Sequence, residues 1–293
     1  MKKCLISFVM LLLCKAMAFS AAAEGDFTPV PWDVKTMPQG PHKSGYLPDN
    51  GGYHDDSIDV RIETFRRDDT TVMVAYVTIV DPTQLRTATA AAKYPSKATA
   101  PVTAMLKKAN GVIGINGDYF AYHGQGIVVR NTRQLRNKPN KGRDTLIIDQ
   151  NGDFTIIQGT TKEKYEAFEG EVIHAFCFGP GLVVDGVPLT DLDTVTMDCG
   201  KSRKTQRIVI GQTGPLQYVL VTCEGPENEG SVGFDLLQMA QLCKELGCIN
   251  AYNLDGGSSC TIALNGKKIN ATSSRKVRYV SDIIYFATLD AEK

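Results

Sequence analysis

Alternating apolar positions near the start of the chain predict a β-hairpin. Isoleucine and valine occupy every second position within 57–65, and 71–80 is rich in β-branched residues. This period of two is typical of half-buried strands, and the polar residues 66–69 between the segments would form the turn. The same criteria predict further short strands at 111–116, 127–129, 145–148, 154–157, 175–184 (two segments around a Gly-Pro-Gly bend), 206–213, 218–223, 250–254, 260–264 and 279–287.

Two segments have the apolar spacing of helices. Residues 98–110 end at Asn110-Gly111, and 234–246 end at Gly247, which suits the left-handed position just after a helix. The second segment has an apolar face made of Leu236, Leu237, Ala240, Cys243 and Leu246. Many short strands with few helices predict the α+β class, as a single domain over 58–290 with a mixed β-sheet core flanked by helices.

Two segments show neither period. Residues 24–57, rich in Pro, Gly, Asp and His, are predicted to form an irregular arm that wraps around the domain. The segment 130–143 is predicted to be a long, solvated polar loop that could also meet an anionic substrate or wall polymer. Its basic residues are Arg130, Arg133, Arg136, Lys138, Lys141 and Arg143.

The first 23 residues have the layout of a signal peptide. Two lysines precede an apolar run at 5–13, and three alanines at 21–23 resemble a cleavage site. The apolar run is too short to span a bilayer comfortably, so no transmembrane segment is expected after processing. Cys14 follows three leucines instead of a small residue, which disfavours a lipoprotein anchor. The chain is therefore predicted to be secreted or periplasmic.

Charge and cysteine content change the picture only modestly. Without the three lysines of 1–23, the 32 basic residues become 29 against 32 acidic ones, a net charge of −3 that gives no sign of nucleic-acid binding. An even number of cysteines favours disulfides in an oxidising compartment, and six allow 15 pairings. The six cysteines that follow the predicted signal peptide lack the paired spacing of a zinc site. They are Cys177, Cys199, Cys223, Cys243, Cys248 and Cys260.

The strongest chemical signal is the segment Asp255-Gly256-Gly257-Ser258-Ser259, which follows the strand predicted at 250–254. Adjacent glycines allow successive N–H groups to converge on an anion, and the carboxylate could serve as a base, nucleophile or metal ligand. The alternative is a tight turn in which Asp255 and the serines cap the backbone.

A second polar segment leaves the strand predicted at 111–116. Asn116-Gly117-Asp118 is placed to line a pocket, although an Asn-Gly turn capped by Asp118 is an equally simple interpretation. His123 follows in a glycine-rich loop. It is a candidate acid or a candidate hydrogen-bond donor to a phosphate, and the alternative is a solvated loop histidine.

Two arginines are candidate phosphate ligands. Arg207 stands at the head of an apolar strand, where it needs an acceptor, either a structural carboxylate or a phosphate held by its planar fork. Arg278 precedes the last predicted strand.

Taken in order, these motifs resemble the phosphodiester glycosidase family, over about residues 58–287. Asn-Leu-Asp-Gly-Gly-Ser-Ser after an amphipathic helix is the most specific element. The resemblance rests on 116–120, 179–186, 207–211 and 253–259. At the position of Asp118 the family often carries a second glycine.

The resemblance implies hydrolysis of a sugar-1-phosphodiester, such as an N-acetylglucosamine-1-phosphodiester, to a free sugar and a phosphomonoester. Asp255 would be the base or oxocarbenium stabiliser, with Asp118 the second candidate. Asn116 and Gly117 would contact the substrate. The arginines, His123 and the backbone at 256–259 would hold the phosphate.

The residues are also compatible with two other functions. The first is a non-catalytic protein that binds a cell wall or glycan polymer on the same fold. The second is a metal-dependent phosphodiesterase with Asp118, His123 and Asp255 as ligands. No cofactor is predicted. A divalent cation is left open but not predicted, because none of the four histidines belongs to a ligand-spaced pair, which ranks the metal-dependent function below the glycosidase.

Overall fold

The computed structural model describes residues 27–33, 35–196, 200–271 and 277–290. The predicted signal peptide lies outside these residues, as do Cys14 and Cys199. Within the described ranges, no helix is both long enough and apolar enough to cross a membrane.

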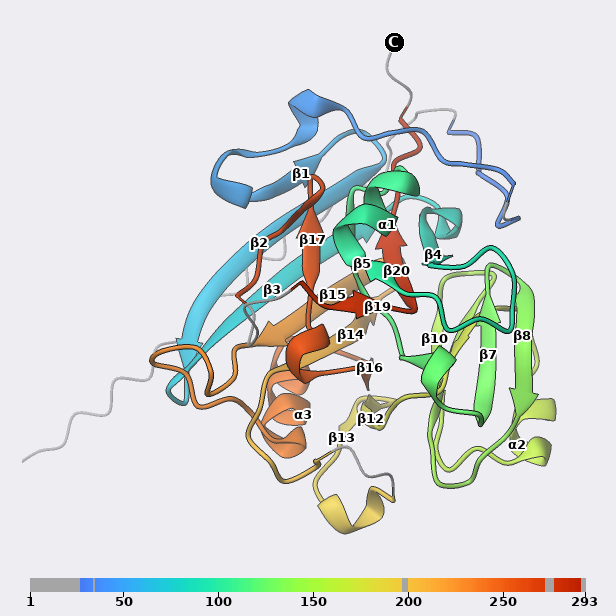
Figure 1. The fold of residues 1–293 in the computed structure, drawn as a ribbon, viewed down its shortest axis with the longest axis vertical. Helices are drawn as coiled ribbons and strands as arrows, with labels where there is room; N and C mark the ends of the chain where they lie inside the picture. Colours follow the sequence, from blue (N-terminus) through green and yellow to red (C-terminus); the bar gives the residue numbers. More distant parts are fainter. Residues whose placement is uncertain (1–26, 34, 197–199, 272–276, 291–293) are drawn as a thin grey trace, which may run out of the picture.

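In the described residues the strands form three main sheets and one small ribbon (Figure 1). The eight-stranded sheet runs β1 (Gly52–His54), β2 (Ile58–Arg67), β3 (Thr70–Ile79), β15 (Gln217–Cys223), β14 (Arg207–Gly214), β16 (Asn250–Asn253), β12 (Gly181–Val184) and β13 (Val187–Pro188). The β9 sheet runs β10 (Phe154–Ile157), β9 (Thr145–Asp149), β11 (Val172–Phe176), β7 (Gly126–Arg130) and β8 (Arg133–Lys138). The β6 sheet runs β18 (Lys267–Lys268), β17 (Ile262–Leu264), β6 (Ile113–Asn116), β20 (Asp282–Phe286) and β4 (Leu85–Thr89), and the ribbon pairs β19 (Tyr279–Val280) with β5 (Ala100–Pro101).

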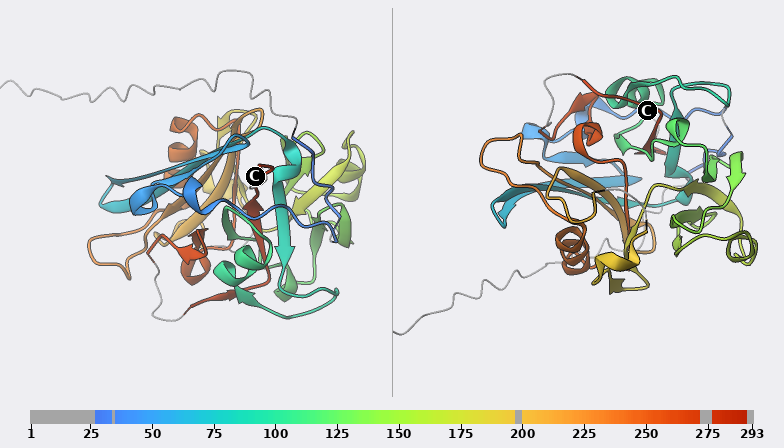
Figure 2. Two further views of the ribbon diagram at one scale, coloured as in Figure 1. Left: turned by 90° about the horizontal axis from the view of Figure 1, so that it is seen from above. Right: turned by 60° about the horizontal axis from the view of Figure 1, so that its bottom comes forward.

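The central strands of the eight-stranded sheet are buried on both faces, because their apolar residues alternate between the two faces. In β14, Ile208 and Ile210 belong to the main core, whereas Val209 packs with the cluster around α3 (Leu236–Glu245). In β15, Leu220 faces the main core and Val219 faces α3. The sheet therefore separates α3 from the β6 sheet, as the right-hand view of Figure 2 shows.

Short helices cover the other sheets. The helix α1 (Val102–Lys108) packs Val102 and Leu106 against β20 and β17, and α2 (Lys162–Glu166) places Tyr165 against the β9 sheet. The β9 sheet lies on the side of the molecule opposite the long β2–β3 hairpin (Figures 1 and 2). Turns of 3-10 helix occur at Lys43–Gly45, Pro48–Asn50, Pro82–Gln84, Phe120–Tyr122, Leu192–Thr194 and Gly257–Ser259.

These elements confirm the predicted α+β class. Neighbouring strands pair antiparallel throughout the described residues, and they are divided among several sheets, a distribution that the sequence pattern did not reveal. The helix expected at 98–110 begins only at Val102, because the residue before Pro101 favours an extended backbone. The helix expected at 234–246 begins after Asp235, whose side chain and that of Gln238 form a capping box.

Residues near the start of the described chain are fastened to the domain by specific hydrogen bonds. The Trp32 indole donates to the carbonyl of Leu85, and the buried Arg86 guanidinium donates to the carbonyls of Val30, Pro31 and Thr36. Arg86 thereby satisfies backbone carbonyls of 30–36, a segment that pairs with no strand among the described residues.

One expectation is corrected by the structure. The segment 130–143 is not a solvated loop, because it contains the strand β8, and its Arg130 and Arg136 are buried. Asn131 and Thr132 both have positive φ and form the tight turn between β7 and β8. The described cysteines are free thiols, so this structure shows none of the expected disulfides among them.

Candidate active site

The Asp255 segment connects two sheets. It leaves β16 in the eight-stranded sheet and enters β17 in the β6 sheet (Figure 1). The Leu254 N–H donates to the Ile208 carbonyl at 3.0 Å, and the Gly257 N–H donates to the Gln206 carbonyl at 2.8 Å, so β14 holds the segment in place. Gly257 has φ +58°, a conformation that favours glycine.

Asn116 braces this segment from the end of β6. Its Nδ2 donates to the Asp255 carbonyl at 2.8 Å, and its Oδ1 accepts from the Thr261 N–H at 3.1 Å. The side chain is fully buried. Asn116 was predicted to bind the substrate, but its side-chain amide instead holds the loop that carries Asp255 in place.

Asp118 lies in a buried network of charges that the sequence analysis missed. Arg130 donates to Asp118 at 2.8 Å and to Asp282 at 2.7 Å, and all three side chains are at most 3% exposed. The Arg130 guanidinium also lies over the Phe176 ring at 3.9 Å. Asp118 accepts a further bond from the Cys177 N–H at 2.9 Å.

The network sets the charge of its carboxyl groups. Burial raises the pKa of Asp118, but the attraction of Arg130 and the Cys177 N–H outweigh this effect, so the net pKa is below its ordinary value. Burial raises the pKa of Asp282, and the nearby Asp118 adds to the rise that Arg130 opposes. Asp118 is thus held ionised beside a second carboxyl group that resists ionisation.

Gly117 is required where this network meets β20. Its N–H donates to the Asp282 carbonyl at 3.0 Å, and a Cβ at this position would lie 2.3 Å from the Asp282 Oδ1. Tyr119, directly after Asp118, adopts the left-handed conformation at φ 61° and ψ 25°. Such conformations are rare for a bulky side chain and cluster at functional sites.

Asp255 differs from Asp118 in being only half-buried. Burial raises its pKa to about 6, Asp118 adds to the rise, and the Ser259 hydroxyl and Arg278 oppose it. A carboxyl group with this pKa exchanges protons near neutral pH, which is what general acid–base catalysis needs.

A cavity of about 450 Å³ borders the loop that carries Asp255, although Asp255 itself does not line it. Ser258, on the same loop as Asp255, and Arg278, whose charge lowers the pKa of Asp255, both line it. Tyr119, Tyr122 and Tyr279 form much of the remaining wall. The other residues that line it are Thr99 and Val277. Its volume falls within the range typical of small-molecule sites, roughly 300–1,000 Å³.

Two of these tyrosines form a flat surface. The rings of Tyr119 and Tyr122 stack with centroids 4.7 Å apart and planes within 9°. Tyr122 is 46% exposed and Tyr279 is 57% exposed, so aromatic surface remains available to a ligand.

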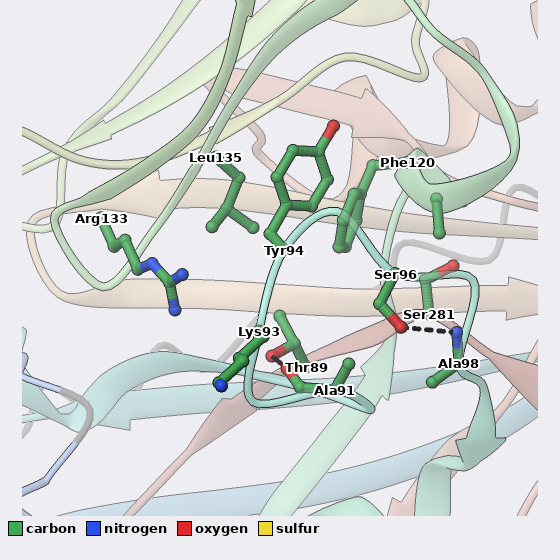
Figure 3. A pocket seen from close by; sticks show the side chains of 11 residues that line it. Thr89, Ala91, Lys93, Tyr94, Ser96, Ala98, Phe120, Arg133, Leu135 and Ser281 are labelled. Carbon is green, nitrogen blue, oxygen red and sulfur yellow. Dashed lines mark hydrogen bonds between the residues drawn. The ribbon is translucent and has the colours of Figure 1, made fainter.

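A second cavity lies behind Phe120 and is much smaller (Figure 3). It measures about 20 Å³ and is lined by Tyr94, Leu135 and Ser281, among others. That volume suits a single water molecule and excludes a sugar ring. A third cavity, of about 340 Å³, is large enough for a small molecule and is lined by Lys141, Asp144 and Thr196, among others, but by no residue of 255–259. The 450 Å³ cavity, which Ser258 lines, is therefore the better candidate for the substrate site.

Gly256 and Ser258 supply the remaining polar groups of the loop. Among the described residues none accepts a hydrogen bond from the N–H groups of Gly256 and Ser258, whereas those of Gly257, Ser259 and Cys260 bind carbonyls of the loop or of β14. These two N–H groups and the Arg278 guanidinium are suited to hold an anion.

The structure does not bring every predicted site residue to this cavity. The buried Arg207 guanidinium donates to the carbonyls of Phe234, Gly200 and Arg203, contrary to the expected phosphate clamp. These carbonyls are the acceptors that a buried arginine requires.

His123 also lies elsewhere. It sits on the side of Asp118 that faces Cys177, with Nε2 4.0 Å from the sulfur, and burial lowers its pKa. Within the described residues, no group of three His, Cys, Asp or Glu side chains is arranged to hold a metal ion.

Comparison with known proteins identifies the class. The model of the phosphodiester glycosidase family matches residues 109–287, so the chain belongs to this family. The resemblance inferred from the motifs is therefore confirmed.

Individual relatives are distant. The chain is 27% identical over 188 residues, or 62% of its length, to the SPbeta prophage-derived uncharacterized protein YomE of Bacillus subtilis (strain 168). It spans only 29% of the length of that protein.

Solved structures share the fold. The catalytic domain of zebrafish N-acetylglucosamine-1-phosphodiester alpha-N-acetylglucosaminidase, auto-inhibited by its pro-peptide, is similar with a TM-score of 0.63 and 18% identity, covering 79% of this chain and 83% of that one. A hypothetical protein from Synechocystis has a TM-score of 0.58 at 16% identity, covering 78% of this chain and 62% of that one. A putative exported protein from Burkholderia pseudomallei K96243 has a TM-score of 0.50 at 15% identity, covering 75% and 74%.

Proposed function

We propose that this protein is an exported hydrolase that cleaves a sugar-1-phosphodiester, such as an N-acetylglucosamine-1-phosphodiester, to a free sugar and a phosphomonoester. The observation that carries the proposal is the half-buried Asp255, whose pKa is raised to about 6 on a loop whose Ser258 lines a cavity together with Arg278. Membership of the phosphodiester glycosidase family supports the reaction class.

In this reaction Asp255 acts as the base. Its ionised carboxylate takes a proton from water, the water oxygen bonds to C1 of the sugar, and the C1–O bond to phosphate breaks. The bonding electrons leave with the phosphate, which departs as a monoester and later receives the proton from Asp255. A phosphomonoester is a good leaving group, so one carboxylate suffices where ordinary glycosidases use two.

The phosphate is held beside this carboxylate. Arg278 supplies a positive charge, and the N–H groups of Gly256 and Ser258 supply donors that no described residue accepts from. The Ser258 hydroxyl adds another donor, and the Ser259 hydroxyl binds Asp255 itself. Charge-assisted bonds of this kind are the strong ones in polar recognition.

Asp118 acts through Asp255 in this proposal. Its hydrogen bonds to Arg130 and Cys177 leave it no exposed surface, and its negative charge contributes to the raised pKa of Asp255. Asn116 and Gly117 hold the strand end and the Asp255 loop together. We assign no phosphate contact to Arg207 or His123, because their bonds lie elsewhere.

Hydrolysis of a panel of sugar-1-phosphodiesters, including a phosphodiester-bearing glycan polymer, tests the proposal. Phosphorus NMR would report a phosphomonoester with the wild-type chain and none with Asp255→Asn. Saturable binding without turnover across the panel would overturn it in favour of a glycan-binding protein. Activity that chelator removes and a divalent cation restores would favour a metal-dependent phosphodiesterase.

A further inference from the structure

The end of helix α3 brings two cysteines together. Cys243 is the third residue from the end of the helix, and Cys248 follows Gly247, whose φ is +84°. The Cys248 N–H donates to the Cys243 carbonyl at 3.0 Å, and the Gly247 N–H donates to the Lys244 carbonyl at 3.0 Å. These two bonds define a Schellman motif, in which the side chains at the positions of Cys243 and Cys248 contact each other.

Both thiols are buried in the same core cluster. Cys243 is 0% exposed and Cys248 is 2% exposed, and both pack with the apolar residues between α3 and the eight-stranded sheet. The two thiols also hydrogen-bond to each other. A disulfide needs Cα atoms about 4.4–6.8 Å apart, a separation that one closed helical turn provides.

The other described cysteines are committed elsewhere. Cys177 faces Asp118 and His123, and the Cys223 thiol donates to the Thr205 carbonyl at 3.4 Å. Cys223 and Cys260 belong to different core clusters, on opposite faces of the eight-stranded sheet. Cys243 and Cys248 are therefore the described pair best arranged to join.

We propose that Cys243 and Cys248 are an oxidation site, where an intramolecular disulfide forms when the chain folds in an oxidising compartment. The structure is then the dithiol form. A thiolate of one cysteine attacks a small-molecule or protein disulfide and releases one thiol. The second cysteine attacks the resulting mixed disulfide and releases the other thiol. Two protein thiols lose two electrons and two protons, and the oxidant is reduced to two thiols.

The timing of this step follows from burial. The hydrogen bond to Cys248 and burial raise the pKa of the Cys243 thiol well above its ordinary value, so little thiolate exists once the chain is folded. The bond should therefore form during folding and should close slowly in the folded dithiol. Once formed, it ties the end of α3 to β16, the strand that leads to Asp255.

Peptide mapping tests the proposal. The wild-type chain is refolded with oxidised glutathione, blocked with an alkylating reagent, and cleaved after Lys and Glu without reduction. Cleavage at Lys244 separates the two cysteines, so a disulfide appears as a linked peptide pair that reduction resolves.

We expect the Cys243–Cys248 pair in the wild type and in a Cys223→Ser control, and its loss in Cys248→Ser. The oxidised wild type should melt several degrees above its reduced form, with no such difference in Cys248→Ser. Complete alkylation of both cysteines after oxidative refolding, or linkage of Cys243 to a different cysteine, would overturn the proposal.

Discussion

The substitution Asp255→Asn is expected to abolish hydrolysis and at the same time stabilise the fold at pH 8. Burial raises the pKa of this carboxyl group from 3.8 to about 6. A group with a raised folded-state pKa contributes stability that is present below its unfolded pKa and is lost as pH rises through the folded pKa. At pH 8 the ionised Asp255 carboxylate therefore destabilises the folded state of the wild type.

The size of this effect follows from the shift. A rise of about two pKa units, at about 1.4 kcal/mol for each unit, gives an upper bound of about 3 kcal/mol at pH 8. Because asparagine carries no charge but keeps polar atoms in the site, we expect a gain of about 1–2 kcal/mol at pH 8 and close to none at pH 4. This corresponds to a melting temperature raised by roughly 2–8 °C at pH 8.

Urea unfolding at pH 4, 6 and 8, followed by circular dichroism, measures the effect. The matched control is Asp56→Asn, which changes an exposed loop carboxylate and should alter neither stability nor hydrolysis. A variant that is less stable than the wild type at pH 8 would show that Asp255 is a structural cap, and retained hydrolysis would remove it from the mechanism.

The pH dependence of the reaction follows from the same group. A base must be ionised, so kcat/KM should rise with pH through about 6 and fall about tenfold for each unit below it. A rate that instead declines above pH 6 would assign Asp255 the role of an acid.

Three further substitutions test the surroundings. Arg130→Met leaves two buried carboxyl groups without their cation and should lower the free energy of unfolding, measured by urea titration, by about 3–5 kcal/mol. The control Arg133→Met changes an exposed arginine and should cost less than about 0.5 kcal/mol. Equal losses in the two variants would contradict the buried network. Gly117→Ala places a Cβ against a buried carboxyl group and should lower the free energy of unfolding by roughly 1–3 kcal/mol. The control Gly124→Ala adds a Cβ in open space and should leave the melting temperature unchanged. Arg278→Ala should lower kcat/KM by about tenfold or more and shift the acid limb of its pH profile upward, because the arginine lowers the pKa of Asp255. An unshifted profile would separate Arg278 from the proposed role of Asp255.

The fold was predictable where the pattern was periodic. Alternation located β2 and β3, and the apolar face of 234–246 predicted a helix that starts within two residues of the observed start of α3. The division into separate sheets was not accessible, because short apolar runs do not indicate which strand lies beside which. Backbone pairing over long sequence separations decides that arrangement.

The candidate site was predictable only in part. A carboxylate followed by two glycines indicated that the Asp255 loop is a candidate site, because those residue types have few structural uses together. Arg130 looked like one of many exposed basic residues, since its partner Asp282 lies 152 residues away in the chain. One signal was available: Arg130 directly follows the apolar run 127–129, so it continues a buried strand, and a buried arginine requires hydrogen-bond acceptors. Arg207 satisfied the same requirement with carbonyl oxygens.

The most direct test of the central claim is the fate of isotopic oxygen. Breaking C1–O or O–P yields the same free sugar and the same phosphomonoester, so products alone do not identify the bond. Hydrolysis of an N-acetylglucosamine-1-phosphodiester in oxygen-18 water, followed by NMR, should place the label on C1 of the sugar and none on phosphate, and the reaction should be absent with Asp255→Asn. Label found in the phosphate would contradict the glycosidase mechanism and make the protein a phosphodiesterase.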